Sequence, residues 1–105
     1  MAIELTESAY ESTLDSGVSL VDFWAPWCQP CRMLGMILEK QVEPQLEELG
    51  VRVCKVNVEN ERDLAARLEI QSIPVLLIYK DGMLMTRLEG LQKPNDILDA
   101  VRTVL

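Results

Sequence analysis

Hydrophobic positions recur with two spacings along this chain, every second residue in some segments and every third or fourth in others. The first spacing is typical of strands and the second of helices, so the chain is predicted to alternate between them. Residues 3–5 fit a short edge strand. Thr6 then stands where it could cap a helix that places Tyr10 and Leu14 one turn apart.

The longest predicted elements form a strand, helix, strand unit. Residues 18–24 are mostly aliphatic and aromatic, which indicates a strand covered on both faces. Leucine and valine recur at helical spacing from about residue 31 to 49, and Gly50 ends this helix. Pro44 is expected to kink or break it, because proline has no N–H and its ring clashes with the preceding turn. Residues 51–58 again resemble a strand.

The second half of the chain continues the alternation and adds a hairpin. Asn60 is placed to cap a short helix. Residues 75–79 and 83–88 flank Asp81-Gly82, a dipeptide that tight hairpins favour because both central residues take positive φ. Pro94 opens a last helix with one apolar stripe. The order βαβαβαββα predicts an α/β fold, a mixed sheet covered by helices.

Length and composition fit one compact domain that spans residues 1–105, with 49% apolar residues to form a core. Acidic residues outnumber basic ones by 17 to 10, and the net charge of −7 disfavours nucleic acids and anionic membranes as partners. The longest apolar run, residues 75–79, is too short to span a bilayer, and the acidic opening is unlike a secretory signal. We therefore expect a cytoplasmic monomer.

The candidate chemistry lies at Cys28 and Cys31, where the buried strand gives way to the long helix. Two intervening residues in a first helical turn bring both sulfurs to bonding distance, so the pair could interconvert between dithiol and disulfide. Cys28 would face the free N–H groups and positive dipole end of the helix, which favour a thiolate, and it is the candidate nucleophile. Pro30 fits the first turn and stiffens it.

Three other interpretations of the pair stay open. A structural disulfide across four residues would add only about 2 kcal/mol in the chain-entropy model. A zinc site normally needs four Cys or His ligands, whereas the chain has no His and one further cysteine, Cys54. Two unrelated core cysteines fit poorly with the flanking Trp and Pro. We favour redox chemistry with no metal or other cofactor, and we expect Cys54 to pack as a small hydrophobe, with a regulatory thiol as the alternative.

Several motifs in order make the sequence similar to the thioredoxin family over nearly its whole length. They are residues 21–25 followed by Trp27 through Cys31, then Ser72-Ile73-Pro74, Lys80-Asp81-Gly82 and Glu89-Gly90. The resemblance implies the thioredoxin fold, a five-stranded mixed sheet flanked by four helices. It also implies a general reductant of disulfide-containing proteins that a flavoprotein, thioredoxin reductase, recharges.

The resemblance implies that residues at matching positions of this chain have the family's catalytic roles. Cys28 would attack the substrate disulfide, Cys31 would resolve the mixed disulfide, and Asp22 would transfer the proton of Cys31. Burial on its strand should raise the pKa of Asp22 and suit it for proton transfer near neutral pH. The alternative is a structural carboxylate neutralised by Lys55, its family partner on the neighbouring strand, and both roles could hold.

The resemblance also implies a substrate-binding surface around the cysteines. Pro74 would follow a cis bond that exposes the Ile73 backbone to an extended substrate, whereas a trans proline that begins an edge strand is the alternative. Trp27 would line an apolar rim with Ile73, Pro74, Gly90 and Leu91.

The chain departs from the family's usual pattern at the active-site dipeptide and in the second helix. Gln29 replaces the usual glycine and, with Pro30, belongs to the expected substrate-binding surface, so the redox potential and the choice of reductase could differ. The usual helix-kinking proline is missing near Gly35, and Pro44 supplies a later break. Two alternatives stay open, an oxidant or isomerase and a non-catalytic binding subunit that uses the apolar rim.

Overall fold

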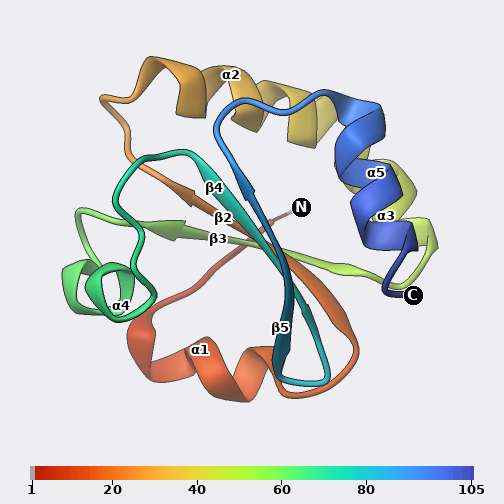
Figure 1. Cartoon of the computed structure of the whole chain (residues 1–105), viewed down its shortest axis with the longest axis horizontal. Helices are drawn as coiled ribbons and strands as arrows, with labels where there is room; N and C mark the ends of the chain where they lie inside the picture. Colours follow the sequence, from red (N-terminus) through yellow and green to blue (C-terminus); the bar gives the residue numbers. More distant parts are fainter. Residues whose placement is uncertain (1) are drawn as a thin grey trace.

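The computed structural model describes residues 2–105 as a twisted mixed sheet with helices on both sides (Figure 1). Its five strands, in the spatial order β1-β3-β2-β4-β5, are β1 (Ile3–Glu4), β2 (Val18–Trp24), β3 (Arg52–Asn57), β4 (Val75–Lys80) and β5 (Met83–Glu89). β1, β3 and β2 pair in parallel, whereas β4 is antiparallel to both β2 and β5. The predicted strand, helix, strand unit and the closing hairpin are both confirmed.

The helical segments are α1 (Glu7–Leu14), α2 (Gln29–Ile37), the π-helical turn η1 (Leu38–Val42), α3 (Glu43–Glu48), α4 (Arg62–Arg67) and α5 (Pro94–Arg102). Because α2, η1 and α3 follow one another without a break, they form one long helix, and the sheet is flanked by four helices as the resemblance implied. The long helix and α5 cover one face, and α1 and α4 cover the other (Figure 1).

The distortion predicted at Pro44 is present, but it is a π-helical turn in the preceding residues and not a break in the long helix. The N–H of Glu43 reaches the carbonyl of Leu38, five residues back, which is the hydrogen bonding of a π-helix. Pro44 therefore stands in the first turn of α3, where its missing N–H has no partner to lose. The long helix also begins at Gln29, slightly earlier than predicted, because Cys28 serves as its N-cap.

Of two helix caps predicted from the sequence, one has the predicted position without the capping bond and the other is wrong. Thr6 holds the N-cap position of α1, but its side chain makes no capping hydrogen bond and lies 3.1 Å from the Ser8 hydroxyl. Asn60 does not cap α4, whose N-cap is Glu61. The Glu61 carboxylate instead accepts a hydrogen bond from the N–H of Glu7 at 2.9 Å, so a residue distant in sequence satisfies the start of α1.

Successive residues of β2 face opposite layers of the core, because strand side chains alternate between the two faces of a sheet. Leu20 belongs to the cluster beneath the long helix and α5, while Val21 and Phe23 belong to the cluster beneath α1 and α4. Asp22 shares the face of Leu20. β2 therefore places a carboxyl group directly under the helix that carries the cysteines.

The turn of the closing hairpin has the backbone conformation that the sequence predicted. Asp81 and Gly82 take positive φ values of 50° and 82°, as predicted for the hairpin turn.

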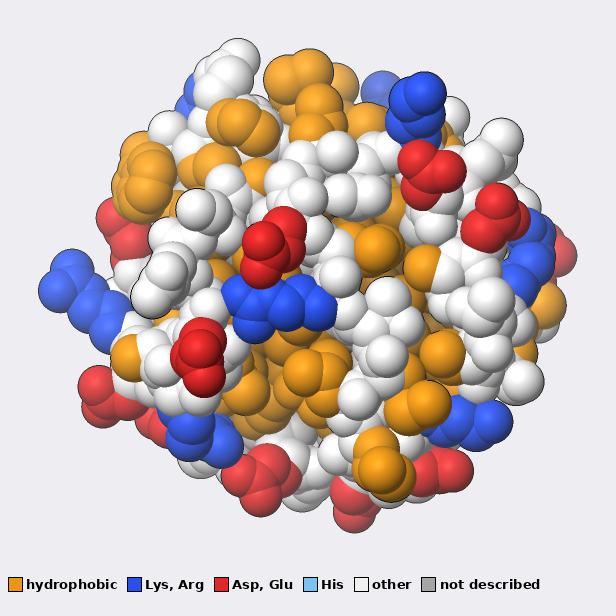
Figure 2. Space-filling view, in the orientation of Figure 1, with side chains coloured by type: hydrophobic (Ala, Val, Ile, Leu, Met, Phe, Trp, Pro, Cys, Tyr) orange, Lys and Arg blue, Asp and Glu red, His pale blue; other side chains and the backbone are white. Residues whose placement is uncertain are grey.

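On the face shown in Figure 2, basic and acidic side chains are interspersed with apolar ones, without a broad basic patch. Among residues 2–105, no helix combines the length and the hydrophobicity needed to cross a membrane.

Candidate functional site

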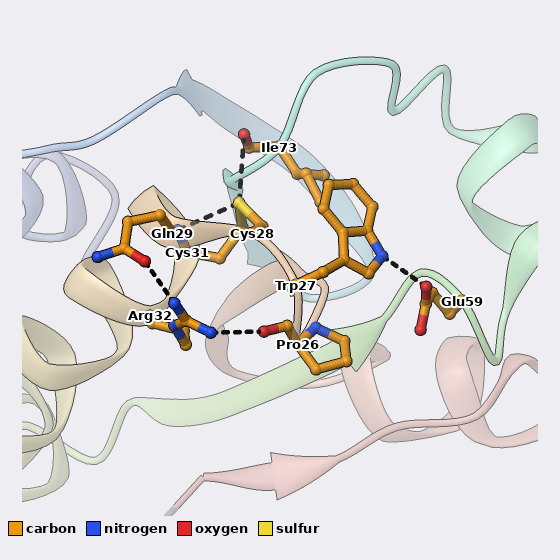
Figure 3. Close-up of a disulfide and its surroundings, with 8 residues drawn as sticks. All are labelled: Pro26, Trp27, Cys28, Gln29, Cys31, Arg32, Glu59 and Ile73. Carbon is orange, nitrogen blue, oxygen red and sulfur yellow. Dashed lines mark hydrogen bonds between the residues drawn. A yellow bond between two sulfur atoms is a disulfide. The ribbon is translucent and has the colours of Figure 1, made fainter.

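Cys28 and Cys31 are joined in a disulfide at the point where α2 begins (Figure 3). Their Cα atoms are 5.2 Å apart, within the usual range for a disulfide. The Cys28 sulfur accepts a hydrogen bond from the N–H of Cys31 at 3.2 Å. The helix start thus directs a free backbone N–H at the Cys28 sulfur, which would stabilise a thiolate there in the reduced protein.

The two sulfurs have different surroundings. The Cys28 sulfur lies 3.9 Å from the carbonyl oxygen of Ile73 (Figure 3). A disulfide sulfur has no proton to donate, so this approach is a packing contact in the oxidised form. Cys31 lines a partly open cavity of about 560 Å³ behind the disulfide, which is also bounded by Asp22 and Lys55. The outer sulfur faces a loop backbone, and the inner sulfur faces buried ionisable groups.

The peptide bond between Ile73 and Pro74 is cis, as the resemblance implied. The carbonyl of Pro74 accepts a hydrogen bond from the N–H of Gly90 at 2.8 Å, which brings two distant loops together beside Cys28. Pro74 is buried, however, and so it supports the expected rim from beneath and does not line it. It is buried because it leads directly into β4, a strand whose residues are buried up to Lys80.

The exposed part of the rim is formed by the other predicted residues. Trp27 is 65% exposed and Leu91 47% exposed, while Ile73 and Gly90 are half-buried. The indole N–H of Trp27 donates a hydrogen bond to the Glu59 carboxylate (Figure 3). Sequence analysis missed Glu59, since no local pattern links it to a tryptophan 32 residues away.

The dipeptide between the cysteines is exposed, at both Gln29 and Pro30. The Gln29 amide oxygen accepts a hydrogen bond from the Arg32 guanidinium, which also donates to the carbonyl of Pro26 at 3.2 Å (Figure 3). The polar end of Gln29 therefore bonds to Arg32 and not to either sulfur.

Asp22 is 6% exposed and faces the cavity with Cys31. Its Oδ1 has no hydrogen-bond partner among the described residues. Burial raises the pKa of Asp22 to about 7, attraction to Lys55 partly opposes this rise, and repulsion from Glu43 adds to it. The carboxyl group therefore changes its charge near neutral pH, next to the inner sulfur.

Lys55 is the register partner of Asp22 in the parallel pairing of β2 and β3. Its ammonium group nevertheless lies over the Trp24 ring, 5.4 Å from the centroid. The close pair between Lys55 and Asp22 that the alternative interpretation implied is not formed, and Lys55 acts on Asp22 through longer-range attraction.

Glu43 is the residue of this cavity that sequence analysis missed. It is 9% exposed and, among the described residues, it and Asp22 are the two buried carboxylic acids. The helical pattern was read from apolar positions, and an acidic residue beside a proline gave no signal of burial. The length of the segment and the position of Pro44 were the available hints of an altered helix.

Cys54 has the packing position that its sequence context favoured. It is fully buried in the cluster beneath α1 and α4, and burial raises the pKa of its thiol to about 11. Within residues 2–105, no three Cys, Asp or Glu side chains are grouped so that they could hold a metal ion.

Comparison with known proteins agrees with the sheet and the cysteine pair. The sequence model of the thioredoxin family matches residues 1–103. Thioredoxin of Staphylococcus aureus is 33% identical over 99 residues, covering 94% of this chain and 93% of that protein. The structure of a thioredoxin variant from Halobacterium salinarum superposes with a TM-score of 0.83 at 29% identity, covering 97% and 88% of the two chains. A thioredoxin from Malassezia sympodialis shares the fold, with a TM-score of 0.84 at 24% identity and coverage of 98% and 90%.

These matches and the cysteine pair at bonding distance favour a reductase over an oxidant, an isomerase or a non-catalytic subunit. The chain belongs to the thioredoxin family, and it is a thiol-disulfide oxidoreductase that reduces disulfide-containing proteins and receives its electrons from a reductase.

Proposed function

We propose that Cys28 is the nucleophile of this protein-disulfide reductase and Cys31 its resolving thiol. The observation that carries this assignment is the asymmetry of the two sulfurs. The Cys28 sulfur accepts a hydrogen bond from the helix N-terminus and lies beside the exposed rim, whereas Cys31 faces the cavity that it shares with Asp22. A thiolate is therefore favoured at the outer position, where a substrate can reach it.

The reaction passes two electrons from the dithiol to the substrate. The Cys28 thiolate attacks one sulfur of the substrate disulfide, and the other substrate sulfur leaves as a thiolate. Cys31 then gives its proton to the Asp22 carboxylate and attacks the Cys28 sulfur. The bond between Cys28 and the substrate breaks, the second substrate sulfur leaves as a thiolate, and the protein keeps its disulfide. A flavoprotein thioredoxin reductase returns the two electrons.

Asp22 suits the proton step because of its position and its acidity. It lines the same cavity as Cys31, and burial raises its pKa to about 7. A group with this pKa is partly ionised at neutral pH, so it can take up a proton and release it again in each cycle. Lys55 assists by attracting the carboxylate form.

The substrate-binding surface is proposed to be the apolar rim of Trp27, Ile73, Gly90 and Leu91. Their exposed or half-buried atoms surround the approach to Cys28, with Pro74 supporting the loop from beneath. Gln29 and Pro30 extend this surface on the helix side. An apolar rim of this kind suits unfolded or flexible disulfide-bearing segments.

We also propose that residues 1–105 act as one domain, as a monomer, in the cytoplasm. The single sheet that joins all parts of the described chain supports one functional unit. The cytosol keeps thiols reduced, which is the condition under which a disulfide reductant works.

Trapping of the mixed disulfide tests the two cysteine roles. Reduced Cys31→Ser, mixed with insulin as the disulfide substrate, should accumulate a covalent adduct that mass spectrometry detects and that dithiothreitol releases. Cys28→Ser should form no adduct, and Met83→Ala, a change at the exposed start of β5, should turn over like the unaltered protein. Adduct formation by Cys28→Ser, or full turnover by both active-site variants, would contradict the assignment.

A further inference from the structure

Glu43 enters the cavity because of the π-helical turn that precedes it. The Glu43 N–H bonds to the carbonyl of Leu38, so this turn holds one residue more than an α-helical turn. One extra residue rotates the following side chains by about 100° around the helix axis. Pro44 then fixes the start of α3 immediately afterwards. The result is a second carboxylic acid buried in the same cavity as Asp22.

Other ionisable groups also bound this cavity. They are Cys31 and Arg32 from α2, Glu39 from η1, Glu47 from α3, and Cys54 and Lys55 from β3. Arg32 is exposed and bonds to Gln29 and Pro26, and Glu39 and Glu47 are exposed to water, which screens their charges. Lys55 lies over the Trp24 ring. Glu43 is thus the acidic neighbour of Asp22 that is itself buried beside this cavity.

We propose that Glu43 is a positioning residue that acts through Asp22, so that its charge moves upward the pH range in which Asp22 accepts the proton of Cys31. The inference rests on the proposed function, in which Asp22 is that proton acceptor. A nearby negative charge disfavours the ionised form of a carboxyl group, so Glu43 favours the protonated form of Asp22. Repulsion from Glu43 raises the pKa of Asp22, in the same direction as burial and against the attraction of Lys55.

This effect changes both the strength and the availability of the base. With Glu43 present, Asp22 ionises at higher pH, and its carboxylate form is a stronger base. Without the Glu43 charge, Asp22 should ionise at lower pH and be a weaker base. The rate of resolution by Cys31 should then reach its plateau at lower pH, and that plateau should be lower.

The direct test follows the Asp22 side-chain carboxyl by carbon NMR in the oxidised protein across the neutral pH range. Glu43→Gln should lower the Asp22 midpoint by at least about half a pH unit, about a threefold change in its ionisation constant. Glu39→Gln makes the same charge change at an exposed position of the cavity and should leave the midpoint unchanged. Glu43→Asp keeps the charge and should stay near the unaltered protein. An Asp22 midpoint in Glu43→Gln equal to that in Glu39→Gln would overturn the inference.

A second measurement separates this inference from the proposed function. Stopped-flow fluorescence gives the pH dependence of Cys31 attack on a preformed mixed disulfide. Loss of the neutral midpoint in Asp22→Asn supports the proposed proton step, and an unchanged profile would contradict it. If the rate profile loses its neutral midpoint in Asp22→Asn but keeps the same midpoint in Glu43→Gln, the inference about Glu43 is contradicted while the proposed function stands. Circular dichroism checks folding, and Glu43→Ala replaces Glu43→Gln in the same comparison if the latter does not fold.

Discussion

The ammonium group of Lys55 lies 5.4 Å from the centroid of the Trp24 ring, although its strand register faces Asp22. Among residues 2–105, the Asp22 carboxyl therefore has no close cation in its cavity, and its Oδ1 accepts no hydrogen bond. Burial outweighs the attraction of Lys55, and the pKa of Asp22 rises to about 7. Because Lys55 is separated from Asp22, the Asp22 carboxyl can gain or lose a proton near neutral pH.

Asp22→Asn should stabilise the oxidised protein at alkaline pH and lose this advantage in acid. The folded pKa of Asp22, about 7, lies above its ordinary value of 3.8, so folding favours the protonated group. Its contribution to stability is complete below about pH 4 and declines as pH rises through 7. The gain from the substitution should therefore grow to at most about 4 kcal/mol above pH 8.

Urea unfolding at acidic and alkaline pH measures this difference. Glu48→Gln, at an exposed position of α3, serves as the control and should show no comparable pH dependence. An equal effect of Asp22→Asn at both pH values would mean that the carboxyl is not held protonated by the fold.

Trp27→Ala should weaken substrate binding, because it removes the most exposed large side chain of the proposed rim. Steady-state reduction of a protein disulfide should show KM raised by about fivefold or more, the effect typical of an aromatic interface residue. Met83→Ala removes a side chain that is 68% exposed at the start of β5 and should leave KM unchanged. The rim would be misassigned if both substitutions changed KM equally.

Cys54 should resist alkylation in the folded, reduced protein. It has no exposed surface, and its pKa is raised to about 11, so little thiolate is present at pH 8. Iodoacetamide followed by peptide mass spectrometry should find Cys28 modified first and Cys54 modified only after denaturation. Rapid labelling of Cys54 under native conditions would instead favour the regulatory alternative.

Leu76→Ala should cost about 2–5 kcal/mol of stability, the usual range for a fully buried leucine. Leu76 pairs with Asp22 across β2 and β4, at the centre of the sheet that holds the site. Leu84→Ala, at a position 48% exposed on β5, should cost far less in the same denaturant titration. Similar losses from the two substitutions would contradict the core described for this face.

The sequence predicted those elements that depend only on residues close together along the chain. The strand over 18–24 was indicated by its run of aliphatic and aromatic residues, and the turn at Asp81-Gly82 by its need for positive φ, and both are found as predicted. Cys28 and Cys31 could be paired because the first turn of a helix fixes their separation.

Features that depend on distant partners were not visible in the sequence. The start of α1 is satisfied by Glu61 and not by Thr6, because tertiary contact supplies a better acceptor. Pro74 was expected on the surface but is buried where its loop joins a covered strand. Glu43 is buried because a π-helical turn changes the face on which it lies, and the apolar spacing alone gave no warning of that turn.

The central claim is that Cys28 and Cys31 form a reducing two-electron couple, and redox equilibration tests it most directly. The protein would be equilibrated in graded dithiothreitol buffers while tryptophan fluorescence and thiol alkylation report its state. We predict a single two-electron transition close to about −270 mV, at the reducing end of the range for such couples. A transition near about −120 mV, or no reversible couple at these two cysteines, would contradict the account.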